Sequence, residues 1–382
     1  MSKSIKILKT LHLASFNGNI GDLANHKGAK RIFSKYLDFR FEYTNLEIRD
    51  FYWKKKQFNK DFIDYANQFD LLIIGGGNYF ELWVENSSTG TSIDIELNLL
   101  RQLKIPTIFY SLGVDIGQGC SKNSARRFND FLKTIIEQKN LFFCVRNDGS
   151  KKALKRLCES DIFSKIPIMP DGGFFASEKN NNNLNVSNSI GINIAGDMLN
   201  QRFNKEVNKE YFINGFKEII EELCAYQPQL KIYFIAHIWK DLILINDLFK
   251  SLKDEYLRKQ VFLEKLEPNI NGLNDFLDSY TKYDLVLGMR FHANVCPIGL
   301  GTPTIGLVNY PQVKLLYEEL NLEHRFVDVR EKGFKEKIIE NTKIDLANSA
   351  SIKIKYKKIK EDLNIQAGEV MLLIENWMKS FF

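Results

Sequence analysis

The sequence lacks the long apolar runs and the cysteine spacings that mark membrane-spanning or disulfide-bonded proteins. No apolar run in its 382 residues approaches the roughly 20 residues that a bilayer span needs. The five cysteines are scattered, with no Cys-x-x-Cys pair, and an odd count without a framework indicates reduced thiols. The N-terminal segment lacks the continuous apolar core and the cleavage site of a signal peptide. We therefore expect a cytoplasmic protein.

A strong excess of one charge is absent too. The net charge of +6 is small for the length and is spread along the chain, without a basic stripe interleaved with aromatics, so we expect no nucleic-acid partner. No carboxylate–histidine cluster has metal-ligand spacing, so we expect no metal. With 44% hydrophobic and 26% charged residues, the chain is typical of a folded globular protein.

Short apolar runs alternate with longer amphipathic stretches, a pattern typical of α/β proteins in which helices cover a parallel sheet. Helical spacing is clearest in Leu23–Leu37 and Ser124–Glu137. The predicted strands are Ile7–Ser15, Asp70–Ile74, Thr107–Leu112, Leu141–Val145, Pro167–Met169, Ile190–Ile194, Lys231–Ala236, Asp284–Leu287, Thr304–Val308 and Arg325–Val329.

A polar, Asn-rich segment, Ser177–Asn188, interrupts this alternation and has almost nothing to bury. We interpret it as a linker between an N-terminal domain, residues 1–178, and a C-terminal domain, residues 189–345. A helical tail, residues 346–382, follows. The tail begins with a basic amphipathic stretch, Lys353–Lys360, which predicts either a helix packed across a domain, the reading we favour, or a peripheral contact with the inner face of the membrane.

Four glycine-bearing loops follow predicted strands of the first half. Glycines let backbone amides approach a ligand, and the N-terminus of a following helix adds partial positive charge. A tight turn without a ligand is the alternative for each loop, but four of them would line one rim of a sheet, where ligands of open α/β sheets bind. The candidate binding residues in these loops are Gly18, Asn19, Gly21, Asp22, Gly76, Gly77, Asn78, Asp115 and Asp171.

The strongest chemical signal is Arg290-Phe-His292 at the end of a predicted strand, with Lys314 beyond the next strand. Arginine offers a fork matched to carboxylate or phosphate, and histidine donates to an oxyanion or moves a proton near neutral pH. The alternative is that Arg290 pairs with a carboxylate such as Asp284 and that His292 is a packed or capping residue. Because three such groups converge on neighbouring strand ends, we favour a functional role.

Two further residues close predicted strands and could reach a cleft between the domains. His237 ends a strand of the second domain, and Asp241 either orients its ring or caps the next helix. Arg146 ends a strand of the first domain, where Asp148 suits a helix cap. His12, His26 and His324 belong to no such constellation, and we expect them to be structural.

Taken in order, these pieces resemble the polysaccharide pyruvyl transferase family. The resemblance spans about residues 11–330 and rests most on Arg290-x-His292 with Pro303 and Lys314. The other matching pieces are Gly18–Asp22, Gly75–Asn78, the Gly113 loop, Val145–Asp148 and Asp171.

The resemblance implies two Rossmann-like domains that face each other across a cleft, as in glycosyltransferases of the GT-B type, with the donor bound by the C-terminal domain. It implies phosphoenolpyruvate as co-substrate, no other cofactor, and as acceptor a sugar of a cell-surface or exported glycan, often lipid-linked. Arg290 and His292 would hold the donor, with Arg146 and Lys314 assisting. His292 would stabilise the phosphate or protonate the methylene carbon, and His237 would deprotonate the sugar hydroxyl.

Two other functions fit the same sequence. One is a GT-B glycosyltransferase that uses a nucleotide-sugar and has a similar basic donor pocket. The other is a non-catalytic glycan-binding protein on the same fold, although an idle site has no need of concentrated positive charge.

Overall fold

The computed structural model describes residues 5–158, 160–179 and 188–382. The chain divides into two compact units. Unit 1 comprises residues 1–16, 25–172 and 363–382, and unit 2 comprises residues 17–24 and 173–362. Two short segments, residues 17–24 and 363–382, thus cluster with the other half of the chain, and the domain bounds expected from the sequence stay a prediction. Most of the predicted linker, residues 180–187, lies outside the described residues.

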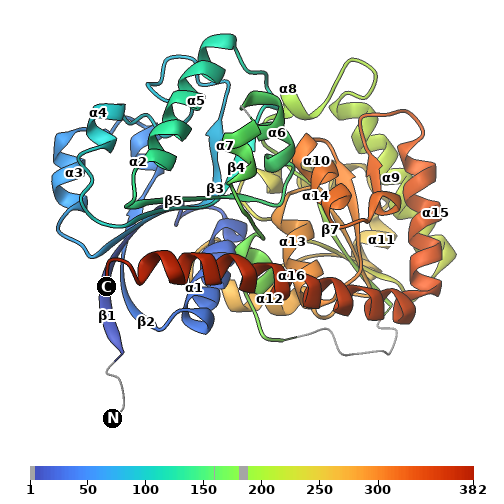
Figure 1. The fold of residues 1–382 in the computed structure, drawn as a ribbon. Coiled ribbons are helices and arrows are strands. Elements are labelled where there is room, and N and C mark those ends of the chain that lie inside the picture. The colour runs from blue at the N-terminus through green and yellow to red at the C-terminus, as the bar shows by residue number, and fades with distance from the viewer. Residues whose placement is uncertain (1–4, 159, 180–187) are drawn as a thin grey trace. The chain divides into compact units, whose positions relative to one another are not determined.

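Unit 1 is built on a six-stranded sheet, sheet A, in which all neighbouring strands are parallel (Figure 1). Its order is β2-β1-β3-β4-β5-β6, so the chain changes direction across the sheet between β1 and β3. Crevices at the carboxyl ends of strands form at such a switch point. The strands are β1 (Lys6–Ala14), β2 (Phe39–Glu47), β3 (Leu71–Glu81), β4 (Thr107–Asp115), β5 (Leu141–Arg146) and β6 (Ile168–Met169).

Helices cover both faces of sheet A, as Figure 1 shows. The amphipathic stretch predicted at Ser124–Glu137 forms α5 (Lys122–Glu137), whose N-cap Ser121 accepts a hydrogen bond from the Ser124 amide and whose Phe128 and Phe131 enter the core. The other helices are α1 (Ile20–Tyr36), which begins with residues of unit 2, α2 (Arg49–Tyr52), α3 (Lys60–Ala66), α4 (Leu97–Leu100), α6 (Ser150–Leu157) and α7 (Ser160–Ser164).

Unit 2 repeats this architecture with a second parallel sheet, sheet B, of order β12-β11-β10-β7-β8-β9. Here the switch point lies between β7 and β10. The two sheets confirm the predicted α/β class and its two Rossmann-like halves. The strands are β7 (Ser189–Asn193), β8 (Lys231–Phe234), β9 (Val261–Leu263), β10 (Leu285–Gly288), β11 (Thr304–Val308) and β12 (Phe326–Asp328).

The helices of unit 2 enclose two apolar clusters, one on each face of sheet B. They are α8 (Leu199–Arg202), α9 (Lys209–Tyr226), α10 (Asp241–Ser251), α11 (Asp254–Lys259), α12 (Leu273–Tyr280), α13 (His292–Leu300), α14 (Pro311–Glu319) and α15 (Phe334–Ala347), with 3₁₀ turns η1 (Gly172–Phe175) and η2 (Glu323–Arg325). No helix among residues 5–158, 160–179 and 188–382 is long and apolar enough to cross a membrane.

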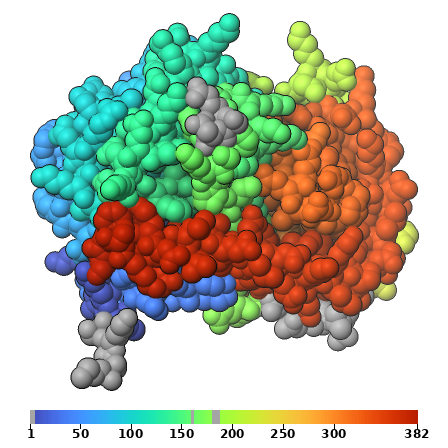
Figure 2. All heavy atoms as spheres, viewed as in Figure 1, coloured from blue at the N-terminus to red at the C-terminus, as the bar shows by residue number. Residues whose placement is uncertain are grey.

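The tail forms one long helix, α16 (Ser349–Met378), whose side chains form a band on the surface in Figure 2. Its basic stretch is not wholly solvated, because Lys353 is buried with its ammonium 3.5 Å from Asp284 and Tyr356 bonds to the Thr304 hydroxyl. Further along, the Trp377 indole donates to the Lys139 carbonyl. The helix therefore packs against the protein, as the favoured interpretation predicts, and the membrane contact stays a prediction.

Two glycine segments lie inside strands and not in the loops predicted after them. β3 continues through Gly75–Asn78 to Glu81, and β4 continues to Asp115. Side chains do not fit at Gly75, where an added Cβ would lie 2.2 Å from the Tyr110 carbonyl oxygen, and Gly76 has φ +78°. Close strand packing and backbone conformation thus explain these glycines without a ligand.

Candidate functional site

The carboxyl edge of sheet B brings together several of the predicted residues. The loop after β7 runs through Gly196 and Asp197, and the turn after β10 carries Arg290 to His292. Because β7 and β10 are neighbours at the switch point, both segments emerge side by side. The sequence thus correctly places Arg290 and His292 at a strand end where ligands bind in such folds.

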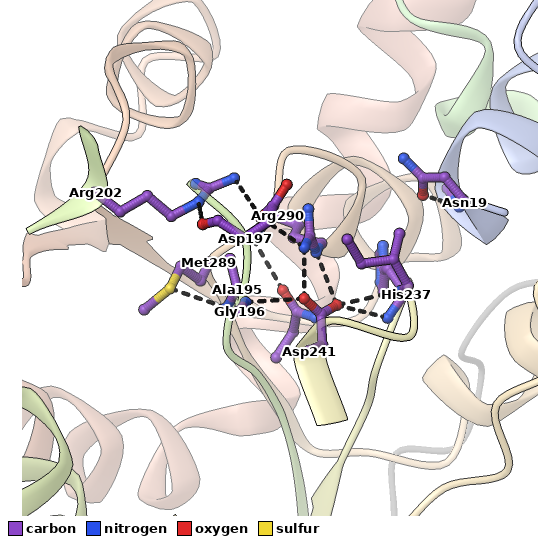
Figure 3. A network of polar contacts seen from close by, with 12 residues as sticks. Asn19, Ala195, Gly196, Asp197, Arg202, His237, Asp241, Met289 and Arg290 are labelled. Atoms are coloured by element: carbon purple, nitrogen blue, oxygen red, sulfur yellow. Dashed lines mark hydrogen bonds and ion pairs between the residues drawn. The ribbon is translucent and has the colours of Figure 1, made fainter. Parts of the chain in front are cut away.

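Arg290 lies at the centre of a buried ion-pair network (Figure 3). Its Nε donates to Asp241 Oδ2 at 2.8 Å, and its Nη2 donates to Asp241 Oδ1 and, at 2.8 Å, to Asp197 Oδ1. Burial opposes the charge, but these carboxylates outweigh it and raise the pKa of Arg290. The expectation of an open arginine fork is therefore wrong in part: two of its three nitrogens are occupied, and Asp241 and Asp197, not Asp284, are the partners.

Asp241, the first residue of α10, organises the surrounding backbone. It is fully buried and accepts hydrogen bonds from the amides of Gly196 at 3.0 Å and His237 at 2.9 Å, besides the two from Arg290. A carboxylate in this setting satisfies donors of three separate loops at once. The sequence suggested that Asp241 orients the His237 ring or caps the next helix. Instead, its carboxylate accepts from the His237 amide, and Lys240 occupies the N-cap of α10.

His292 begins α13 and is buried beside the start of α1. Its Nδ1 lies 3.8 Å from Asp22 Oδ1, and a Cβ added to Gly21 would lie 2.6 Å from the His292 Cβ. Only glycine permits this approach. The N-termini of α1 and α13 therefore meet at one place, where their amides and partial positive charge favour an anion.

The segment before α1 turns as the sequence predicts. Gly18 has φ +79°, which favours glycine, and Asn19 Oδ1 accepts a hydrogen bond from the Gly21 amide at 3.0 Å. The Ile20 amide donates to the His237 carbonyl at 3.2 Å, which fixes the helix start against the loop after β8. Asp22 lies in the first turn of α1, where a negative charge suits the partial positive charge of the helix N-terminus.

His237 is placed in an apolar setting. Its Nε2 bonds to the Tyr280 hydroxyl at 2.8 Å, and its ring meets Phe276 edge-on. Burial, followed by the charges of Arg290 and His292, holds the pKa of His237 well below its usual value. The ring is therefore neutral, and its contacts are those of a packed histidine. The proposed role of His237 as a base stays an untested prediction.

Lys314 lies in the first turn of α14 with partners of its own. Its ammonium is 3.9 Å from Glu318 and lies over the Phe326 ring, and its side chain is 51% exposed. The structure therefore does not bring it into the Arg290 network, contrary to the convergence expected. A role in binding the donor stays a prediction.

The remaining predicted residues belong to unit 1. Arg146, at the end of β5, donates to Asp148 Oδ2 through Nε and Nη2 at 2.9 and 2.7 Å, and its Nη1 lies 3.4 Å from Asp171 Oδ2. All three side chains are buried. Asp148 is thus an ion-pair partner and not the predicted helix cap, since Gly149 occupies the N-cap of α6.

Asn78 and Asp115 are linked on the neighbouring strands β3 and β4, where Asn78 Nδ2 donates to Asp115 Oδ2 at 2.9 Å. The Gly76 α-carbon packs against the His26 ring, and the Gly77 α-carbon packs against the Tyr79 ring. His12 and His26 are buried and bond to backbone carbonyls, as expected for structural histidines.

Sequence reasoning missed three residues at these edges. Asp197 and Arg202 belong to the Arg290 network, and a signal for Asp197 existed in Gly196-Asp197 directly after a buried strand. Glu81 ends β3 beside Asp115 and accepts a hydrogen bond from the buried Ser92 hydroxyl. Burial raises the pKa of Glu81 to about 7, which no sequence pattern indicates.

Comparisons with known proteins agree with this architecture. A glycosyltransferase from Rickettsia africae ESF-5 is similar over 98% of this chain and 100% of its own, with a TM-score of 0.56 and 9% identity. S. aureus MnaA, in a co-structure with UDP, covers 95% of this chain and 91% of its own, with a TM-score of 0.51 and 9% identity. At such low identity these likenesses show the fold alone, that of GT-B-type enzymes.

A putative UDP-N-acetylglucosamine 2-epimerase from Listeria monocytogenes has a TM-score of 0.50 and 11% identity, over 94% of this chain and 90% of its own. No curated protein matches the sequence.

The model of the polysaccharide pyruvyl transferase family matches residues 19–310, which include Arg290, His292 and the start of α1. The chain therefore belongs to the polysaccharide pyruvyl transferase family and is a transferase.

Proposed function

We propose that the protein transfers a pyruvyl group from phosphoenolpyruvate to a sugar, where it forms a ketal. The observation that carries this proposal is the meeting of the α1 and α13 N-termini around His292, beside Arg290, in a chain of this family. Phosphoenolpyruvate has a carboxylate and a phosphate. Backbone amides at helix N-termini and a fixed guanidinium are the groups that bind such anions.

The carboxyl edge of sheet B supplies these groups from rigid elements. Arg290 cannot swing freely, because Asp241 holds both its Nε and its Nη2. Its Nη1 makes no hydrogen bond within the part of the chain that the structure describes, and this nitrogen can donate to the phosphate or carboxylate of the donor. A preorganised donor costs little reorganisation when charge develops in the reaction.

Ketal transfer begins with delivery of a proton to the methylene carbon of phosphoenolpyruvate, which leaves a cationic centre at its second carbon. A sugar hydroxyl attacks that centre and loses its proton, phosphate leaves, and a second hydroxyl closes the ketal with loss of another proton. We assign to His292, at the α13 N-terminus, donation to the phosphate or to the methylene carbon.

The proposal is tested with His292→Gln, which keeps a side chain of similar size but cannot carry an imidazole proton. We expect phosphate release from phosphoenolpyruvate in the presence of acceptor to fall by at least 100-fold, because general acid–base groups contribute about 10²–10⁴ in rate. His324→Gln, at an exposed histidine, is the matched control and should keep full activity. Near-normal activity of His292→Gln would refute the role of His292.

The donor itself is tested separately by thermal unfolding of the wild-type protein. We expect phosphoenolpyruvate to raise the midpoint, since a ligand that binds only the folded state stabilises it. Stabilisation by UDP, with none by phosphoenolpyruvate, would favour a nucleotide-sugar glycosyltransferase instead.

A further inference from the structure

A second arginine shares the carboxyl edge of sheet B with Arg290. Arg202, at the end of α8, is buried and donates through Nε to the Asp197 carbonyl at 2.9 Å and through Nη2 to Asp197 Oδ1 at 3.2 Å. Its Nη1 donates to Asn309 Oδ1 at 3.0 Å. Two guanidinium groups therefore flank one carboxylate, that of Asp197.

Asn309 adds a buried donor whose hydrogen bond is not made. It follows β11, the neighbour of β10, and is fully buried. Arginine is only a donor, so the amide oxygen must face Arg202 and the orientation of the amide is fixed. Its Nδ2 has no acceptor among the described residues. A buried donor left in this way is costly, so the site favours an acceptor that supplies the missing hydrogen bond.

The two carboxylates of the network are held very differently. Asp241 is fully buried and bonded to three backbone amides besides Arg290, whereas the Asp197 side chain is 22% exposed and uses one oxygen, Oδ1, for both arginines. The residue after Asp197, Met198, has φ +52°, a conformation that side-chain-bearing residues rarely adopt. Asp197 is therefore the more easily displaced partner.

We propose that Arg202, Asn309 and Nη1 of Arg290 form an anion subsite, and that Asp197 neutralises it until an anionic group of the donor takes its place. The inference rests on the proposed function and deepens it. With Asp197 in place, two arginines face two carboxylates. With Asp197 displaced, one positive charge is in excess. An incoming carboxylate balances this charge, and a phosphate, with a charge of about −1.5 to −2, more than balances it.

The sign of one mutational effect tests the subsite. Asp197→Asn keeps the shape but removes the competing charge, so we expect phosphoenolpyruvate to bind at least fivefold tighter by titration calorimetry. Arg202→Met removes a guanidinium and should weaken binding at least tenfold. Asp328→Asn is the matched control, because Asp328 also pairs with an arginine of unit 2, Arg330, and should leave the affinity unchanged.

If Asp197 only stabilises the fold, Asp197→Asn will bind the donor equally or more weakly, and the inference is overturned. Titrations with inorganic phosphate and with pyruvate show which anionic group enters, since only the occupant of the subsite gains affinity in Asp197→Asn. If wild-type protein binds phosphate but not phosphoenolpyruvate, the proposed function fails while the phosphate titrations still decide the subsite. Absence of binding by all three anions overturns both.

Discussion

The carboxyl edges of the two sheets each hold carboxyl groups, but in opposite electrostatic settings. In sheet B, burial disfavours the charge of Asp197, yet Arg290 and Arg202 outweigh it and lower the pKa of Asp197. In sheet A, Glu81 lies beside Asp115, and burial together with that carboxylate raises the pKa of Glu81 to about 7 even though Arg49 opposes the shift. Arginines therefore keep Asp197 ionised at the edge of sheet B, whereas Glu81 at the edge of sheet A titrates near neutral pH.

This difference shows that the same topological position does not determine the ligand. Both edges lie at a switch point of a parallel sheet, where ligands bind in such folds. At the edge of sheet B, arginines hold the carboxylates and helix N-termini lie beside them, whereas at the edge of sheet A burial raises the pKa of Glu81. The local charges therefore differ although the topology is the same.

We expect the largest loss in the free energy of unfolding from Arg290→Met, which disrupts the ion-pair network at the edge of sheet B. It leaves Asp241 buried without its cation, and breaking such a pair costs about 3–5 kcal/mol. Chemical unfolding should report this loss. The matched control Arg330→Met breaks a more exposed pair and should cost at most about 1 kcal/mol. A loss for Arg290→Met no greater than that of the control would show that the network is not a structural centre.

The next largest expected effect is a pH dependence of the free energy of unfolding that arises from Glu81. The unfolded carboxyl ionises near 4.5, while the folded one keeps its proton to about 7. Because the folded pKa is raised, the contribution of Glu81 to stability is greatest below pH 4.5, falls as pH rises to about 7 and is then constant. The difference is about 3 kcal/mol, at 1.36 kcal/mol per pKa unit.

Urea unfolding at several pH values measures this dependence. Glu81→Gln should remove the fall between pH 4.5 and 7, whereas Glu85→Gln, at an exposed position of the same segment, should keep it. The same pH profile in wild type and Glu81→Gln would contradict the raised pKa.

Much of the fold follows from the sequence because its signals are local. Buried parallel strands appear as short apolar runs, and all ten predicted strands overlap observed ones. Two strands were missed, β2 and β9, and both are edge strands. In β2, Phe39, Phe41 and Tyr43 alternate with exposed residues. Its period-two pattern was available in the sequence, but the strand lacks the continuous apolar run of its neighbours.

The charge balance of the site could not be predicted in the same way. Asp241 and Asp197 lie 49 and 93 residues before Arg290, so only tertiary structure brings them together. The prediction failed in a different way at Gly75–Gly77. These glycines suggested a ligand-binding loop, but strand packing explains them. Residue types at strand ends indicate a site, whereas partners distant in sequence decide which of its groups are available.

The smallest structural effect expected at the edge of sheet B is that of Lys314→Met. The ion pair with Glu318 is long and exposed, so the free energy of unfolding should change by less than about 0.5 kcal/mol. Lys314 nevertheless lies in the first turn of the helix that follows β11, on the same edge as Arg290, and its charge should attract a doubly anionic donor. We expect KM for phosphoenolpyruvate to rise severalfold at low ionic strength and the effect to shrink in 0.5 M salt, because added ions screen exposed charges. Lys343→Met, at a lysine paired with Glu222 on α15, is the control for a change in net charge alone. Equal KM values in the two variants would remove Lys314 from the donor site and leave recognition of the anion to the groups around Arg290.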